Sequence, residues 1–168
     1  MSTEEHRKKA LRQIRIAVIS ISTTRTLADD KSGIWIKNQA KKEGHEVMVH
    51  QVVKDDITDI QNLMTHVVEK IAPHAVIMTG GTGLSPKDVT IEAVQPFFDK
   101  TLTAFGPVFA QLSFEEIDAA AIGSRATAGI IKNVLVFCIP GSLKACKLAC
   151  NELIFPELGH LLKHMRDN

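Results

Sequence analysis

The sequence predicts an α/β fold, a three-layer α/β/α domain with a mainly parallel sheet. Four short apolar runs, rich in β-branched residues, recur along the 168 residues, and segments with helical spacing or helix-capping residues separate them. Strands that are buried on both faces of a parallel sheet have such nearly unbroken apolar sequences. Polar or glycine-containing turns follow the runs, and ligands of such sheets bind beyond the carboxyl ends of the strands.

The expected elements alternate along the chain. The strands are 14–22, 46–53, 75–79 and 134–139. The helices are 32–42, 57–71 and 90–98, one opened by a Ser-Phe-Glu-Glu capping box at 113–116, one from 143 to about 155, and a last amphipathic one to 165. Gly44 is the expected stop of the first helix, Phe105-Gly106-Pro107 a break between elements, and Pro156 the break between the last two helices.

Length and composition bound the class of protein. Residues 1–13 form a charged arm, and 14–168 are expected to be a single domain, because no linker or repeat interrupts them. A net charge of +1 gives no support for a nucleic-acid partner. No apolar run reaches the roughly 18 residues of a membrane span, and no signal-peptide core is present, so we expect a cytoplasmic protein without a membrane partner. Three cysteines and seven histidines show no metal-ligand spacing and are expected to be packing or surface residues.

The most informative segment is Thr79-Gly80-Gly81-Thr82-Gly83-Leu84-Ser85-Pro86-Lys87-Asp88. It lies between an expected strand and an expected helix, where glycines let the main-chain amides approach an anion closely. Asp88 is placed to hold a cation bound to phosphate. Because the Gly-Lys-Ser/Thr ending is missing, the segment is not a Walker A loop, and it predicts a phosphate and magnesium site of another kind.

Each of the other candidate residues also has an ordinary structural explanation. Asp88 can cap a helix, and so can Asp55 and Asp56, which stand just before one. Ser142, in the turn Pro140-Gly141-Ser142, suits both a helix N-cap and a phosphate ligand. The fork of donors on Arg125, in Ser124-Arg125, suits a phosphate or a surface ion pair.

Together these turns resemble the MoaB/Mog family of molybdenum cofactor biosynthesis proteins, from about residue 14 to 162. The matching segments are Thr23 to Gly33, Val53 to Asp56, Thr79 to Ala93, Leu112 to Glu116, Ser124 to Gly129, and Pro140 to Ser142. The Ser-Phe-Glu-Glu segment and the charged arm look more like the MoaB branch.

The resemblance implies a molybdopterin adenylyltransferase. Such an enzyme transfers AMP from ATP to the terminal phosphate of molybdopterin, releases pyrophosphate and needs Mg²⁺. Carried over by motif, Asp55 and Asp88 are the catalytic and metal-binding acids. The substrate-binding residues carried over are Gly80, Gly81, Thr82, Gly83, Ser124, Arg125, Pro140, Gly141 and Ser142. The family also implies a homo-oligomer, a trimer or hexamer, and a downstream metal-insertion enzyme as a partner.

Two points remain open at this level. This chain has Ser22-Thr23 where many members of the family have Ser-Asp, so contacts of that acid are not carried over. The alternative function is a non-catalytic molybdopterin-binding or scaffold protein of the same fold. Retention of both Asp55 and Asp88 favours the enzyme.

Overall fold

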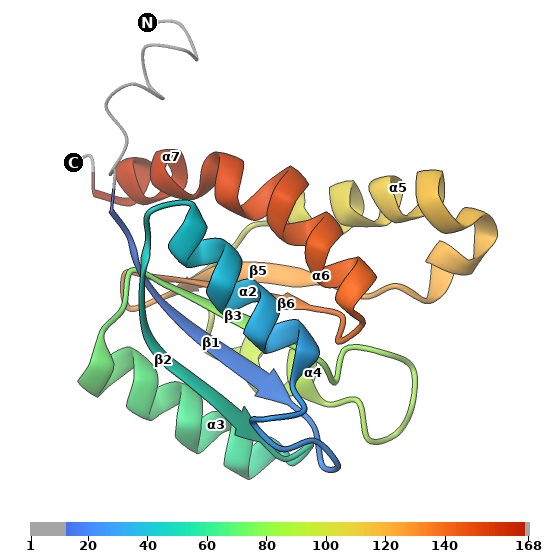
Figure 1. The fold of residues 1–168 in the computed structure, drawn as a ribbon, viewed down its shortest axis with the longest axis horizontal. Coiled ribbons are helices and arrows are strands. Elements are labelled where there is room, and N and C mark those ends of the chain that lie inside the picture. Colours follow the sequence, from blue (N-terminus) through green and yellow to red (C-terminus); the bar gives the residue numbers. More distant parts are fainter. Residues whose placement is uncertain (1–12, 167–168) are drawn as a thin grey trace, which may run out of the picture.

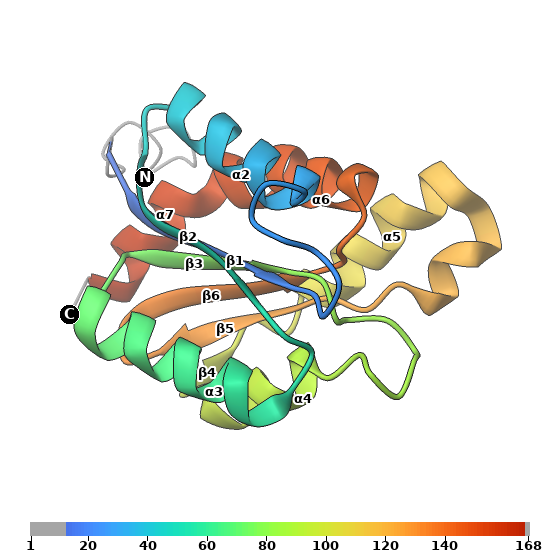
Figure 2. The ribbon, with the colours of Figure 1, turned by 60° about the horizontal axis from the view of Figure 1, so that its bottom comes forward.

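A computed structural model describes residues 13–166. The expected charged arm therefore lies almost wholly outside the described residues. A six-stranded sheet with the order β2-β1-β3-β6-β5-β4 forms the middle layer, and helices cover both of its faces (Figures 1 and 2). The predicted three-layer α/β/α fold is confirmed.

Four strands of the sheet are parallel, as expected. They are β1 (Arg15–Ile21), β2 (Glu46–Val53), β3 (Ala75–Thr79) and β6 (Val134–Ile139). Sequence reasoning missed two strands, β4 (Lys100–Thr101) and β5 (Thr127–Ile131). β5 runs antiparallel to β6, and β4 runs antiparallel to β5. The hairpin between β5 and β6 turns through Lys132 and Asn133, both with positive φ, which is the geometry of a two-residue hairpin without the usual glycine.

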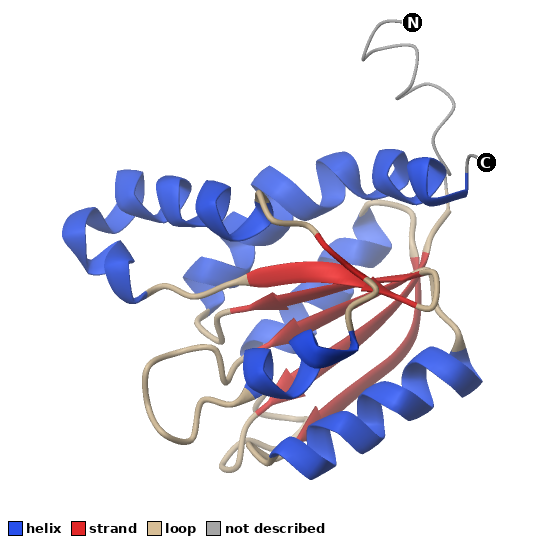
Figure 3. Cartoon of the chain, turned by 180° about the vertical axis from the view of Figure 1, so that it is seen from behind, coloured by secondary structure: helices blue, strands red, loops and turns tan. Residues whose placement is uncertain are grey.

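The two faces of the sheet carry separate apolar cores. On one face pack α2 (Lys31–Lys42), α5 (Phe105–Ile117), α6 (Leu143–Ala149) and α7 (Phe155–Arg166). On the other pack α3 (Ile57–His66) and α4 (Thr90–Val94), as the view from behind shows (Figure 3). Five-residue π-helical turns, Val67–Ile71 and Cys150–Ile154, follow α3 and α6, and 3-10 turns, Gln95–Phe97 and Asp118–Gly123, follow α4 and α5.

Three helix predictions were wrong in detail. Phe105-Gly106-Pro107 opens α5 instead of breaking the chain, because proline in the first turn of a helix loses no needed N–H donor. Ser113 opens no helix and is buried inside α5. Pro156 does not separate two helices, because the wider π-helical turn just before it accommodates the missing hydrogen bond.

The apolar face of α7 packs within the chain's own core. Leu158 and Leu162 are fully buried there, with Leu161 and Met165 packed against the same core. This packing accounts for the amphipathic pattern of the C-terminal helix. All three cysteines are free and buried, as expected of packing residues.

Candidate functional site

The turns singled out in the sequence meet at one edge of the sheet. β1, β2, β3 and β6 are parallel, so the segments that follow them emerge at the same edge. Ser124 and Arg125 also lie at this edge, and the sequence analysis could not explain this because it missed strand β5. They precede the antiparallel strand β5, whose amino end lies at the edge where the other strands end.

A cavity of about 400 Å³ opens at this edge. Its lining includes ten of the eleven predicted site residues: Asp55, Gly80, Gly81, Thr82, Gly83, Asp88, Ser124, Arg125, Pro140 and Gly141. The eleventh, Ser142, lines a different hollow and caps α6 by accepting a hydrogen bond from the Ala145 amide. Of the two roles predicted for Ser142, helix cap and phosphate ligand, the hydrogen bond in the structure therefore supports the helix cap.

The glycine loop lies where the direction of the sheet order reverses, between β1 and β3. Gly80 and Gly81 both have positive φ, +102° and +64°. A Cβ at Gly80 would overlap the Ile21 carbonyl of β1, and one at Gly81 would overlap the Thr90 hydroxyl. Thr90 donates a 2.8 Å hydrogen bond to the Gly80 carbonyl, which supports the loop as expected. Only glycine fits this close packing without strain.

Asp55 and Asp56 have different roles although they are neighbours. Asp56 is the N-cap of α3 and accepts from the Asp59 amide at 3.0 Å. Asp55 lies in the cavity, and its Oδ2 accepts a 2.8 Å hydrogen bond from the Thr23 hydroxyl. Thr23, which occupies the position of the aspartate in the family's Ser-Asp motif, thus contacts the predicted catalytic acid Asp55.

Asp88 does not cap α4, whose N-terminal residue has no side-chain cap. Its Oδ2 instead accepts from the Ser85 amide at 2.9 Å and closes the loop. Among the described residues, none donates a hydrogen bond to Oδ1 of Asp88 or Oδ1 of Asp55. Each carboxylate therefore has one oxygen that holds the loop and one without a protein partner.

The two carboxylates fit magnesium of the nucleotide-bound kind. Mg²⁺ in such sites takes one or two protein carboxylates and completes its shell with phosphate oxygens and water. No group of three or more His, Cys, Asp or Glu residues able to hold a metal occurs in residues 13–166. The donor set thus suits a cation that arrives with a nucleotide better than a resident structural metal.

Arg125 fits both interpretations that the sequence left open, an ion pair and a phosphate ligand. Its Nη2 donates a 2.6 Å hydrogen bond to Glu92 Oε1, and the same side chain lines the cavity. Burial would raise the pKa of Glu92, but the hydrogen bond and charge of Arg125 outweigh it and lower that pKa. The charged pair fixes the guanidinium at the cavity wall.

The sequence analysis included the turn after β1 among the matching segments but assigned none of its residues to the site. Ile21, Ser22, Thr24 and Arg25 also line the cavity, as does Gly123. The Ser22 hydroxyl accepts from the amides of Thr24 and Arg25, which shapes the loop. No described residue pairs with the exposed Arg25 guanidinium, and a lone cation beside a phosphate loop was the signal that could have identified it.

Fold and site define the class of protein: an α/β protein with a glycine-rich loop and two acids at the switch point of its sheet. A family model described as a probable molybdopterin binding domain matches residues 17–160. Molybdenum cofactor biosynthesis protein B of Bacillus subtilis is 43% identical over 99% of this chain and 98% of its own length. A crystal structure of a molybdenum cofactor biosynthesis protein B superposes with a TM-score of 0.89 at 40% identity, covering 94% of this chain and 98% of the other.

The chain belongs to the MoaB/Mog family of molybdenum cofactor biosynthesis proteins. The predicted resemblance is thereby confirmed. A protein of Pyrococcus furiosus named molybdopterin adenylyltransferase is 39% identical over 99% of this chain and all of its own length. This similarity confirms the prediction of an enzyme. No helix within the described residues has the length and apolar character needed to span a membrane.

Proposed function

We propose that this enzyme transfers AMP from ATP to the terminal phosphate of molybdopterin. A phosphate oxygen of the pterin forms a bond to the α-phosphorus of ATP, the bond to the bridging oxygen of the β-phosphate breaks, and pyrophosphate leaves. The observation that carries the proposal is the convergence of the glycine loop, Asp55, Asp88 and Arg125 on one cavity. Relatives that carry the name of this activity support the same conclusion.

The cavity supplies what nucleotidyl transfer requires, which is positioning and charge neutralisation. The amides of Gly80 to Gly83 can hold phosphate oxygens, and Arg125, which also lines the cavity, can bind a second anionic group. Asp55 and Asp88 would hold Mg²⁺ through the oxygens that the protein leaves without partners, and the cation would neutralise the phosphates. Thr23 and the Ser85 amide fix the orientation of these two carboxylates.

Two substrates need more room than the central cavity offers. An adjoining hollow of about 660 Å³ shares Ser22 and Arg25 with it and includes Leu27, Lys54 and Leu63. Its mixed apolar and basic lining suits the ring system of a phosphorylated substrate whose phosphates lie at the glycine loop. Assembly as a trimer or hexamer and transfer of the product to a metal-insertion enzyme also remain proposals drawn from the family.

The decisive experiment compares three neighbouring acids. Asp55→Asn and Asp88→Asn keep the hydrogen bonds from Thr23 and from the Ser85 amide but remove charge, so adenylated pterin should form at least about 100-fold more slowly. That factor corresponds to about 2.7 kcal/mol of transition-state stabilisation. Asp56→Asn is the matched control, because asparagine caps a helix nearly as well as aspartate, and its rate should be unchanged.

One result of this comparison would contradict the proposed catalytic roles of Asp55 and Asp88. Wild-type turnover in both Asp55→Asn and Asp88→Asn would remove the catalytic assignment and favour a binding or scaffold role. Chelation gives an independent check, since two anionic substrates approach each other only when their charge is neutralised. Full turnover in excess chelator would show that no divalent cation takes part.

A further inference from the structure

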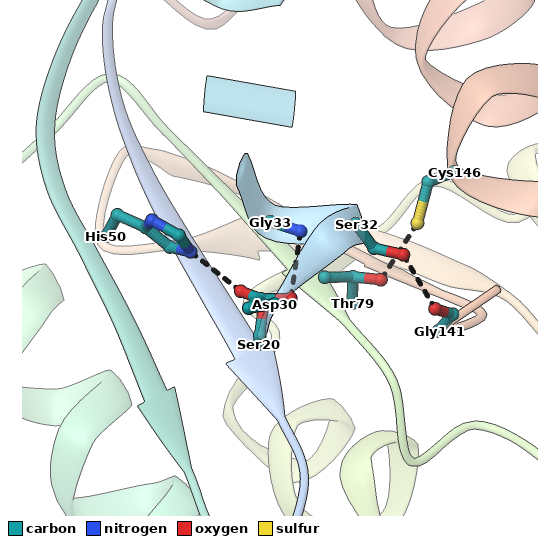
Figure 4. Close-up of polar contacts among 8 residues, drawn as sticks. All are labelled: Ser20, Asp30, Ser32, Gly33, His50, Thr79, Gly141 and Cys146. Atoms are coloured by element: carbon teal, nitrogen blue, oxygen red, sulfur yellow. Dashed lines mark hydrogen bonds and ion pairs between the residues drawn. The ribbon is translucent and has the colours of Figure 1, made fainter. Parts of the chain in front are cut away.

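A buried carboxylate lies beside the site and has no part in the chemistry proposed above. Asp30 is fully buried and does not line the cavity. Its Oδ2 accepts a 2.5 Å hydrogen bond from the Ser20 hydroxyl and lies 2.7 Å from Nε2 of His50. Its Oδ1 accepts from the Gly33 amide at 3.0 Å. Figure 4 shows these partners converging on one side chain from β1, β2 and α2.

The carboxylate is held in its charged form. Burial would raise the pKa of Asp30, but the hydrogen bonds of Ser20, His50 and the Gly33 amide outweigh it and lower the pKa. A buried charge is tolerated only when it is paired and hydrogen-bonded, and the His50 side chain beside it is 6% exposed. Three structural elements therefore depend on one charged group, and its neutralisation would loosen all three.

Asp30 caps the first turn of α2, and a second set of contacts leads from that turn toward the cavity. Ser32, two residues further along the chain, donates its hydroxyl to the Gly141 carbonyl at 2.9 Å. Thr79, at the end of β3, donates to the Pro140 carbonyl at 2.9 Å. A Cβ at Gly141 would lie 3.0 Å from Cα of Gly80, so the turn rests directly on the glycine loop.

Asp30 also fixes one end of the loop that carries Arg25. The other end is held where the Ser22 amide donates to the Val53 carbonyl at 2.8 Å and Thr23 donates to Asp55. Between these anchors the side chains are exposed, and Arg25 lines the cavity. The position of Arg25 thus depends on anchors at both ends of its loop.

We propose that Asp30, His50 and Ser32 are positioning residues that hold residues 22–30 and the turn 140–142 in the geometry that receives phosphate. The effect on turnover rests on the function proposed above, whereas the effect on the two segments does not. If the network serves only general stability, its loss should lower the melting temperature without altering the cavity walls or substrate affinity. The experiment below separates these roles.

The test uses the full chain with Asp30→Asn, Ser32→Ala and the pair His50→Gln and His50→Leu. Glutamine keeps an N–H donor toward Asp30 and leucine does not. His74→Gln is the control, because His74 is a partly buried histidine at the opposite end of the sheet, where it accepts from the Arg15 amide. Measurements are made well below each melting temperature. The first measurement is hydrogen exchange in peptides that contain residues 22–30 and 141–142. The second is the fluorescence emission of Trp35, the single tryptophan, which lies on α2. The third is kcat and KM for ATP.

We expect faster exchange in both segments for Asp30→Asn and His50→Leu, faster exchange at 141–142 for Ser32→Ala, and a kcat/KM for ATP about tenfold lower in all three. His50→Gln should retain most of the wild-type behaviour, and His74→Gln all of it. Unchanged exchange, emission and kinetic constants in folded variants would overturn the proposal. If the wild type itself forms no adenylated pterin, the proposed function fails, and exchange still decides the positioning role. If Asp30→Asn does not fold, the comparison of His50→Gln with His50→Leu decides the role for residues 22–30, and Ser32→Ala decides it for the turn 140–142.

Discussion

Replacement of Gly81 by alanine tests the glycine loop most directly. Gly81 has a φ of +64°, and an added Cβ would overlap the Thr90 hydroxyl. Gly44 is the matched control, because its φ is +88° and a Cβ there would meet nothing within 4 Å. Both variants therefore carry the strain of an L-residue at positive φ, and only Gly81→Ala also carries a clash at the site.

The magnitudes follow from these contacts. Alanine at positive φ costs roughly 1–2 kcal/mol, partly offset by the lower entropy of the unfolded variant chain, so Gly44→Ala should lose about 1 kcal/mol. Gly81→Ala should lose about 2–4 kcal/mol, because displacement of Thr90 also breaks its hydrogen bond to the Gly80 carbonyl. For a chain of this length each kcal/mol lowers Tm by about 2–4 °C.

The assay is chemical denaturation of both variants together with calorimetric titration of ATP in the presence of Mg²⁺. Gly81→Ala should bind ATP at least about tenfold more weakly, and Gly44→Ala should bind as the wild type does. Equal loss of stability in the two variants would show that Thr90 does not constrain the loop. Unchanged ATP affinity in folded Gly81→Ala would show that the loop is only a turn.

Three further predictions concern charged groups. Glu92→Gln removes the charge that holds Arg125 and should raise KM for molybdopterin several-fold. The free energy of unfolding should change by less than about 1 kcal/mol, because the pair is partly exposed, and an unchanged KM would mean that the charge of Glu92 has no positioning role. Arg25→Gln should weaken ATP binding roughly tenfold by calorimetry, and an unaltered Kd would remove this residue from the site. Burial and the charge of Arg15 lower the pKa of His74 below 6.5. As pH falls, His74 therefore binds a proton in the unfolded chain at a higher pH than in the folded chain. The free energy of unfolding thus decreases as pH drops from 6.5 through the lowered pKa. His74→Gln should therefore lose less stability than the wild type between about pH 7 and about pH 5 in denaturant titrations, and an equal loss would contradict this account.

β1, β3 and β6 could be predicted because each is an apolar run buried on both faces. β2 is a partly exposed edge strand, and its valines made it predictable. β4 was missed because it has only two residues. β5 is as long as β3, but Ala128 and Gly129 weaken its strand pattern, and its turn uses Lys132 and Asn133 instead of a glycine pair. The helix errors at Pro107 and Pro156 share one cause. A proline breaks a helix only when an N–H donor is needed at its position. None is needed in the first turn of α5, where Pro107 lies, and the π-helical turn before Pro156 accommodates the missing donor.

The candidate site divides in the same way. Motif and local chemistry identified the glycine loop, Asp55, Asp88 and Arg125, since glycine-rich turns after strands and isolated acids beside them suit phosphate and magnesium. Local chemistry alone did not separate Asp55 from Asp56, and the family motif selected Asp55 and left Asp56 as a cap. The two residues are neighbours in the chain, and only the direction of each side chain distinguishes a ligand from a cap.

The sequence by itself determined the parallel strands, the layer arrangement and the glycine-rich loop at the site, because periodicity and glycine content are local properties of the chain. Only the tertiary structure decided which distant residues share a surface. The antiparallel course of β5 brings Arg125 to the site, and the pairing of β1 with β2 brings His50 to Asp30. The physical reason is that side-chain contacts between strands depend on strand order and register, which no single segment of the sequence contains.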